Sequence, residues 1–150
     1  MGADERFCRE FGELEFAPAG NYLPCVRSGK LLFLSGMLPR TMEGVSHTGK
    51  LGVLSKEEGY AAARNAAICA LHAVRKKIGS LDLVSRVLCL TVFVNCLPDF
   101  TEIPFVANGA SDLLVEIFGE AGKHARTAVG APSLPLNAAV EISLILELRE

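Results

Sequence analysis

An arginine that precedes a run of small residues is the first feature of this sequence that could support chemistry. It stands as Arg126 in HARTAVGAPSLP, residues 124–135. If 125–131 is a strand, Arg126, Ala128 and Gly130 share one face, and the small side chains leave space beside the guanidinium. Arginine suits a carboxylate because its planar group donates two parallel hydrogen bonds. The alternative is an arginine at a sheet edge that is solvated or paired with an acid.

Glu141 is the second candidate, because it interrupts the otherwise apolar segment AAVEISLI. We expect Leu134 and Pro135 to turn the chain so that Glu141 returns beside Arg126 on the adjacent strand. If assembly covers that face of the sheet, the carboxylate is partly desolvated. Its pKa then rises, which suits general acid–base catalysis. On an open face Glu141 would be a solvated surface acid.

Ser35 and Gly36 end the apolar run LLFLSG. The glycine either lets another group approach the backbone closely or simply ends the strand. His47 and His124 are isolated, and the five cysteines show no Cys-x-x-Cys or Cys/His metal spacing. We therefore expect no metal site and place both histidines in loops or on the surface. The sequence contains no nucleophile elbow, P-loop or dinucleotide fingerprint.

The composition is that of one globular domain, which we predict to span residues 1–150. Half of the residues are apolar and the formal net charge is −2. The absence of a basic stripe argues against a nucleic-acid partner, and we expect the basic cluster Arg75–Lys77 in the last turn of a helix. The polar N-terminus is unlike a signal peptide and no run fits a membrane span, so we expect a cytoplasmic protein.

Hydrophobic periodicity and turn residues predict the elements that must position these side chains. A tight turn at Ser28–Lys30 would join a hairpin whose second strand is Leu31–Ser35. A helix begins after Ser55, with Glu58 completing a capping box, and ends at Gly79. The remaining predicted elements are a strand over 84–95, a helical region that includes 110–120 with Gly119 near its end, and strands over 125–131 and 139–148.

This order predicts an α+β fold with a mixed sheet of five strands, or six if an N-terminal strand is added, and two helices on one face. On strand 84–95 the apolar residues occupy both faces, so both must be covered. We assign Leu88, Leu90, Val92 and Val94 to one face and Val87, Cys89, Thr91 and Phe93 to the other. Because two helices cover only one face, we predict that the other is buried by self-association into a homo-oligomer.

Two longer stretches together resemble the RidA/YjgF family. AGNYLPCVRSGKLLFLSGMLP, residues 19–39, is similar to its N-terminal motif. HARTAVGAPSLPLNAAVEI, residues 124–142, is similar to its C-terminal signature and keeps the spacing between the arginine and the glutamate. The resemblance implies the chorismate-mutase-like fold of the Bacillus type, a homotrimer whose sheets pack into a central barrel, and sites in the clefts between subunits.

The resemblance also implies a reaction, the hydrolysis of reactive 2-enamine and 2-imine acids such as 2-aminoacrylate to 2-keto acids and ammonia, with no cofactor. Arg126 would hold the substrate carboxylate and Glu141 would position or activate the attacking water. The backbone carbonyl of Gly36 would accept from the imine nitrogen. The resemblance places Tyr22, Ser35 and Thr127 along the pocket.

Two departures from the family pattern concern the pocket wall and the choice of substrate. Met37 stands where many deaminating members have Gln, and Ala128 stands where many have Cys. Two alternatives to the deaminase stay open. One is a non-catalytic module that binds small carboxylates or partner proteins at the same clefts. The other is the endoribonuclease or translation-inhibitor activity ascribed to some family members.

Overall fold

The longest helix begins and ends where the sequence predicts. In the computed structural model, which describes residues 1–15, 17–18 and 20–150, α2 spans Lys56–Ile78. The Ser55 side chain accepts the Glu58 N–H, and the Glu58 carboxylate accepts the Ser55 N–H in return. Gly79 ends the helix at a positive φ of 92°. The predicted capping box and glycine terminus are therefore confirmed.

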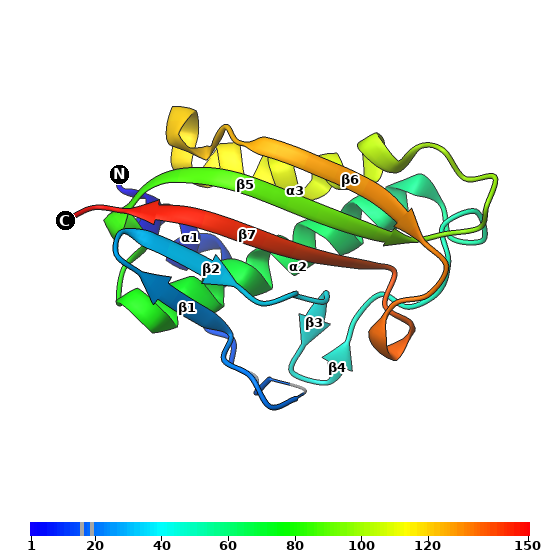
Figure 1. Cartoon of the computed structure of the whole chain (residues 1–150), viewed down its shortest axis with the longest axis horizontal. Helices are drawn as coiled ribbons and strands as arrows, with labels where there is room; N and C mark the ends of the chain where they lie inside the picture. The colour runs from blue at the N-terminus through cyan, green and yellow to red at the C-terminus, as the bar shows by residue number, and fades with distance from the viewer. Residues whose placement is uncertain (16, 19) are drawn as a thin grey trace.

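A mixed sheet forms the other layer of the molecule (Figure 1). Its five strands lie in the order β1-β2-β7-β5-β6; β5 and β6 are parallel, and all other neighbours are antiparallel. The strands are β1 (Cys25–Ser28), β2 (Leu31–Leu34), β5 (Val84–Asn95), β6 (Ala125–Ala131) and β7 (Val140–Leu148). A separate two-stranded hairpin is formed by β3 (Arg40–Thr41) and β4 (Gly44–Val45). The predicted α+β class and five-stranded mixed sheet are confirmed.

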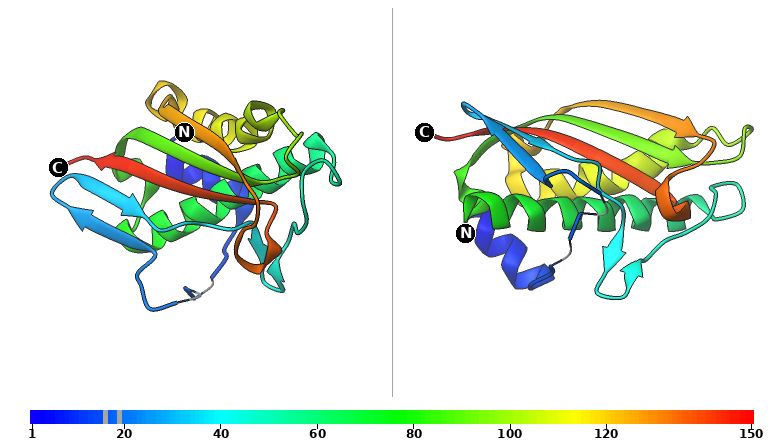
Figure 2. Two further views of the ribbon diagram at one scale, coloured as in Figure 1. Left: turned by 45° about the vertical axis from the view of Figure 1, so that its right-hand side comes forward. Right: turned by 60° about the horizontal axis from the view of Figure 1, so that its bottom comes forward.

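Two long helices, α2 and α3 (Ile103–Phe118), cover one face of the sheet (Figure 2). The core lies between these layers, and alanines dominate the buried part of α2. Short 3₁₀ helices η1 (Leu81–Leu83), η2 (Gly119–Gly122) and η3 (Pro135–Asn137) join the elements. None of the described helices is both long and apolar enough to cross a bilayer.

The alternation of buried side chains follows the prediction on β7 but not along the whole of β5. On β7 every second residue from Val140 to Leu148 is buried, as expected. On β5 the register with β7 shifts between Val87 and Cys89, which makes Leu88 an extra residue. Val87 is therefore buried on the same side as Leu90, and Leu88 is only partly buried. The prediction that Leu88 and Leu90 share a face is wrong because of this bulge.

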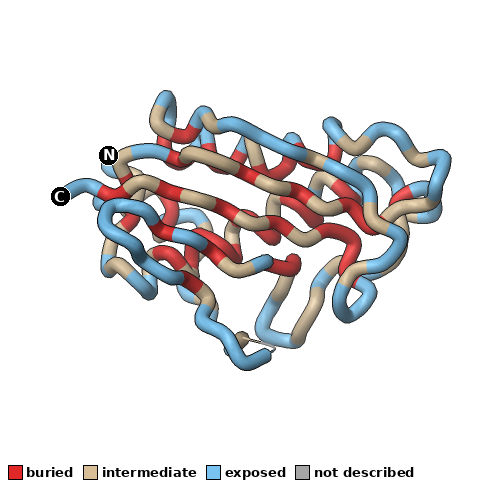
Figure 3. Tube along the Cα trace, in the orientation of Figure 1, coloured by how far each residue is buried: buried red, intermediate tan, exposed pale blue. Residues whose placement is uncertain are grey.

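The face of the sheet away from the helices is open in a single chain. Partly buried and exposed residues alternate with buried ones along its strands (Figure 3). It presents Val26, Phe33 and Val129, which are 52%, 41% and 42% exposed. Exposed apolar side chains on a contiguous face favour association, so the predicted homo-oligomer retains its physical basis as a prediction.

The N-terminus forms a helix that the sequence analysis missed. Residues Ala3–Phe11 are α1, and the sheet has no sixth strand among the described residues. Phe16 and Ala19, the second of which is the first residue of the N-terminal motif, lie outside the described residues. Phe7 is fully buried, with its ring edge against His72 of α2. Two phenylalanines four residues apart, Phe7 and Phe11, were the available signal for an amphipathic helix.

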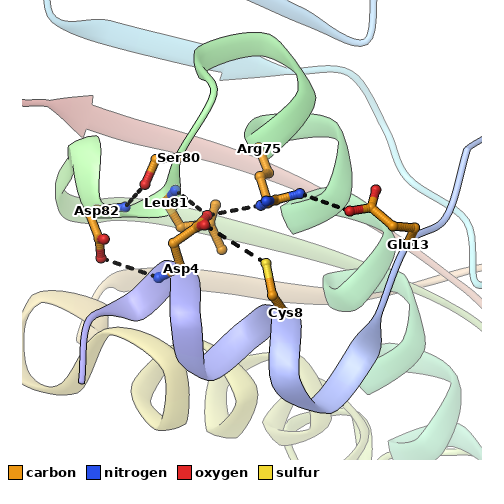
Figure 4. Close-up of polar contacts among 7 residues, drawn as sticks. All are labelled: Asp4, Cys8, Glu13, Arg75, Ser80, Leu81 and Asp82. Atoms are coloured by element: carbon orange, nitrogen blue, oxygen red, sulfur yellow. Dashed lines mark hydrogen bonds and ion pairs between the residues drawn. The ribbon is translucent and has the colours of Figure 1, made fainter.

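Polar contacts anchor α1 to the end of α2 (Figure 4). The Asp4 carboxylate accepts hydrogen bonds from Arg75 Nε at 3.0 Å and from the Leu81 N–H at 2.8 Å. Arg75 also pairs with Glu13, and Lys76 pairs with Glu15. The basic cluster Arg75–Lys77 thus lies in the last turn of α2, as predicted, and two of its members are neutralised within the chain.

Asn95, at the end of β5, is a buried polar residue that connects three segments. Its Nδ2 donates to the Ala138 carbonyl at 3.1 Å and, at 3.3 Å, to the Gly49 carbonyl. Its Oδ1 accepts from Lys50 Nζ at 2.7 Å. The loop before α2 and the segment before β7 are therefore tied to the same side chain.

We expect Asn95→Ala to lower the free energy of unfolding by about 2–3 kcal/mol, because it leaves several buried polar groups without partners. Urea denaturation monitored by circular dichroism measures this change. Asn21→Ala, at an exposed loop position, is the matched control and should change stability by less than about 0.5 kcal/mol. Equal effects of the two substitutions would contradict the role given to Asn95.

Candidate functional site

Glu141 lies on the open face of the sheet, directly against Gly36. It pairs with Phe93 across β5 and β7. After β2 the chain meets β7 again through two hydrogen bonds between Met37 and Ile142, with N···O distances of 2.7 and 2.9 Å. This bridge places Gly36 beside Glu141, and a Cβ at Gly36 would overlap Oε1 of the carboxylate. The Glu141 carboxylate can therefore occupy this position only because Gly36 has no side chain.

The Glu141 carboxylate is half-buried and has no partner among the described residues. Burial raises its pKa above that of an ordinary glutamate. None of the side chains or backbone amides described here donates a hydrogen bond to it, and no described cation pairs with it. A partly desolvated carboxylate with free lone pairs is chemically suited to accept a proton from water.

Ser35, Gly36 and Tyr22 line a small cavity that follows the end of β2. The cavity has a volume of about 20 Å³ and is also lined by Met37. The Ser35 hydroxyl donates to the Leu23 carbonyl at 2.6 Å, which fixes the segment that carries Tyr22. Tyr22 is itself half-exposed. Three of the residues predicted from the sequence, Tyr22, Ser35 and Gly36, therefore line one cavity, and Gly36 also lies against Glu141.

Arg126 lies elsewhere, on the side of β6 that faces the helices. It pairs with Leu90, whose side chain is buried under those helices. Its Nη1 donates to Asn108 Oδ1 at 2.7 Å and to Ser111 Oγ at 3.2 Å, both on α3. Arg126 is therefore an exposed side chain on an edge strand, as one alternative from the sequence had it, but α3 holds its Nη1 and no described acid pairs with it.

Ala128 and Gly130, the small residues beside Arg126, allow close packing of neighbouring side chains as well as leaving space near the guanidinium. A Cβ at Gly130 would lie 2.8 Å from Cys96 Sγ and 3.3 Å from the Ile103 side chain. Ala128 packs against the core. The expected hollow is therefore filled at Gly130 by neighbouring side chains.

The expectation that Glu141 returns beside Arg126 on an adjacent strand is wrong within one chain. The strand β5 lies between β6 and β7 and pairs with both. Because Arg126 pairs with Leu90 and Glu141 with Phe93, three residues further along β5, the two side chains point to opposite faces. Thr127 pairs with Thr91 and shares the open face with Glu141, two strands away. A single chain thus carries two separate groups of candidate residues.

The sequence analysis missed Asn108 and Ser111, the two α3 residues that hold Arg126. They are three residues apart, which places them on the same face of the helix. That spacing was the available signal, but it pointed to no partner without the position of β6. In the described part of the chain, no group of three His, Cys, Asp or Glu side chains is arranged to hold a metal ion.

Comparison with known proteins identifies a family and a similar protein that each match most of the chain. Residues 8–148 match the family described as YjgF/chorismate mutase-like, which groups candidate endoribonucleases. The chain is 50% identical over 134 residues to protein TCP17 of Trypanosoma cruzi, covering 88% of this chain and 84% of that one.

Two solved structures resemble the chain over almost its whole length. A protein of unknown function from Agrobacterium tumefaciens is 38% identical, with a TM-score of 0.88 and coverage of 99% of this chain and 92% of that one. A candidate endoribonuclease from Shewanella oneidensis is 34% identical, with a TM-score of 0.93 and coverage of 99% and 100%. These likenesses confirm the chorismate-mutase-like fold that the two sequence motifs implied.

Proposed function

Since the chain belongs to the YjgF/chorismate mutase-like family, we propose that it is a hydrolytic deaminase of reactive 2-enamine and 2-imine acids. The observation that carries this proposal is the half-buried Glu141 carboxylate, which lies without a hydrogen-bond partner among the described residues against the backbone of Gly36. The products are a 2-keto acid and ammonia.

In this reaction Glu141 acts on water and Gly36 on the substrate nitrogen. The raised pKa makes the Glu141 carboxylate a better proton acceptor than an ordinary glutamate. It takes a proton from water as the oxygen bonds to C2 of the imine and the π electrons of the C=N bond move to the nitrogen. The nitrogen takes that proton from Glu141 and becomes an amine, and the Gly36 carbonyl accepts a hydrogen bond from it. Glu141 then takes the proton of the new hydroxyl as the keto group forms and the C2–N bond breaks, and this proton passes to the leaving nitrogen to give ammonia.

Arg126 is proposed to hold the substrate carboxylate, and this requires a second subunit. Within one chain Arg126 and Glu141 point to opposite faces of the sheet. We propose a homotrimer in which the edge strand β6 of one subunit lies against the open face of the next, so that each cleft combines Arg126 and Thr127 of one subunit with Glu141, Gly36, Tyr22 and Ser35 of the next. The exposed apolar side chains on the open face supply the driving force for this assembly.

The proposal predicts that the purified protein speeds keto-acid release from 2-aminoacrylate that a serine dehydratase generates in the same cuvette. We expect Arg126→Ala to reduce this acceleration about 10- to 100-fold, because the charge-assisted hydrogen bonds to the carboxylate are lost. Size-exclusion chromatography should show an unchanged oligomer. Arg27→Ala, which removes a surface arginine bonded to the Gly29 carbonyl, is the control and should leave the rate unchanged. Equal rates for wild type and Arg126→Ala would contradict the proposal.

The name of the Shewanella protein motivates a second candidate function, RNA cleavage. The net charge of −2 and the absence of a basic stripe in the sequence weigh against it. RNA degradation that disappears in Glu141→Ala and Arg126→Ala would support cleavage at this site. Degradation that persists in both variants would indicate a contaminant. Saturable binding of pyruvate by calorimetry without any rate effect would instead indicate a carboxylate-binding module.

A further inference from the structure

Arg126 is fixed by hydrogen bonds from one side of its guanidinium only. Both contacts use Nη1, which donates to Asn108 Oδ1 at 2.7 Å and to Ser111 Oγ at 3.2 Å. The Nη1 nitrogen has two hydrogens, so both are in use. Among the described residues, none accepts a hydrogen bond from Nε or Nη2 of Arg126. The Nη1 donors of the guanidinium are therefore occupied, and the Nε and Nη2 donors remain available along its other edge.

His124 determines how Ser111 takes part in this contact. Its Nδ1 lies 2.6 Å from the Gly122 carbonyl oxygen, which can only accept, so Nδ1 carries the hydrogen. In the neutral ring, Nε2 is then an acceptor, and it lies 2.9 Å from Ser111 Oγ. The Ser111 hydroxyl therefore donates to His124 and turns its lone pairs toward Arg126.

We propose that Asn108, Ser111 and His124 are positioning residues that hold Arg126 so that its Nε–Nη2 edge binds a carboxylate side-on. This inference rests on the proposed function, in which Arg126 holds the substrate carboxylate. End-on binding would need the outer hydrogen of Nη1, and that hydrogen is already donated to α3. The side-on edge is the remaining pair of parallel donors, and it matches the two oxygens of a planar carboxylate.

The expected consequence is on binding rather than on the chemical step. A free arginine side chain loses rotamer freedom when a ligand fixes it, and the contacts with α3 have already removed that freedom. Loss of these contacts should therefore weaken binding of any small carboxylate. It should leave the chemical step at Glu141 unchanged, because that carboxylate lies on the opposite face of its own sheet and would be supplied to the cleft by the neighbouring subunit.

The test compares Asn108→Ala and Ser111→Ala with Ser111→Thr, which keeps the hydroxyl. Asp112→Ala, on the same helix but bonded to Tyr60, is the matched control. Calorimetric titration with 2-oxobutanoate and steady-state kinetics of the imine reaction are the readouts. We expect Kd and KM to rise about three- to tenfold in the two alanine variants. The kcat of the two alanine variants should stay within about twofold of the wild-type value. For Asp112→Ala and Ser111→Thr, Kd, KM and kcat should all stay within about twofold of wild type. A fall in kcat at constant KM would overturn the positioning role.

A measurement without substrate separates this inference from the proposed function. Rotation about the Cζ–Nη1 bond of Arg126, measured by ¹⁵N NMR, should be slow in the wild type and faster in Asn108→Ala. Equal rotation in both would overturn the inference even if the deaminase activity is found. Slow rotation in a wild type that neither binds 2-oxobutanoate nor speeds imine hydrolysis would contradict the proposed function and the side-on carboxylate role together, and leave only the anchoring of Arg126.

Discussion

Glu141→Gln is expected to make the protein nearly inactive and, at neutral pH, more stable. The carboxylate is the proposed proton acceptor, and its replacement by an amide should slow imine hydrolysis by about 100- to 10,000-fold. The same group is half-buried without a described hydrogen-bond donor, so its charge costs folding free energy that an amide of equal size avoids. Loss of activity with a gain of stability is the signature of a functional charge kept in an unfavourable environment.

The pH dependence of stability follows from the same pKa shift. Burial raises the pKa of Glu141 in the folded chain above its value in the unfolded chain. Between these two values the folded chain binds more protons, so the contribution of Glu141 to stability falls as the pH rises through the window. Below the unfolded value both states are protonated and the contribution no longer changes. The advantage of Glu141→Gln should therefore be present at neutral pH and disappear in acid.

Urea denaturation at pH 7 and near pH 4, beside the coupled imine assay, measures both effects. Glu147→Gln is the matched control, because it makes the same substitution on the same face of β7. Its amide oxygen can still accept the hydrogen bond from Ser85, so the rate should stay at the wild-type value. A Glu141→Gln variant that is less stable than the wild type at pH 7 would contradict the description of this carboxylate.

Local sequence signals were sufficient for the two long helices and the five strands of the main sheet, but not for α1 or the β3–β4 hairpin. The capping box of α2 depends on residues three positions apart, and the burial of β7 depends on alternation within one strand. These interactions lie within short segments and can be predicted without knowledge of the tertiary fold. The contact between Gly36 and Glu141 instead depends on the bridge from Met37 to Ile142, which joins distant parts of the chain, and only the family resemblance suggested a shared site.

Strand order and register could not be read in the same way. The turn at Leu134–Pro135 does bring the chain back, but β7 pairs with β5 and not with β6. The parallel register of β5 and β6 then decides which face receives Arg126. The bulge at Leu88 likewise depends on the partner strand, because an extra residue exists only relative to a register. A pattern within a single element therefore predicts neither the position of β6 in the sheet nor the contacts of Arg126 with α3.

Gly36 offers a way to move the Glu141 carboxylate without removing it. Its φ lies outside the positive region, so an alanine is compatible with the backbone there. The added Cβ would overlap Glu141 Oε1 and lie 2.9 Å from Cδ, which forces the whole carboxyl group aside. The obstruction is the flexible end of a side chain, so we expect the free energy of unfolding to fall by no more than about 1 kcal/mol.

The expected effect of Gly36→Ala on catalysis is much larger than its effect on folding. A displacement of about 1 Å at a reacting group costs on the order of 100-fold in rate. In the Glu141→Gln background the same alanine should cost little, because no carboxylate remains to be displaced. The coupled imine assay on the wild type, the two single variants and the double variant measures this coupling. Additive losses would mean that Gly36 and Glu141 act independently, against the contact that the structure shows between them.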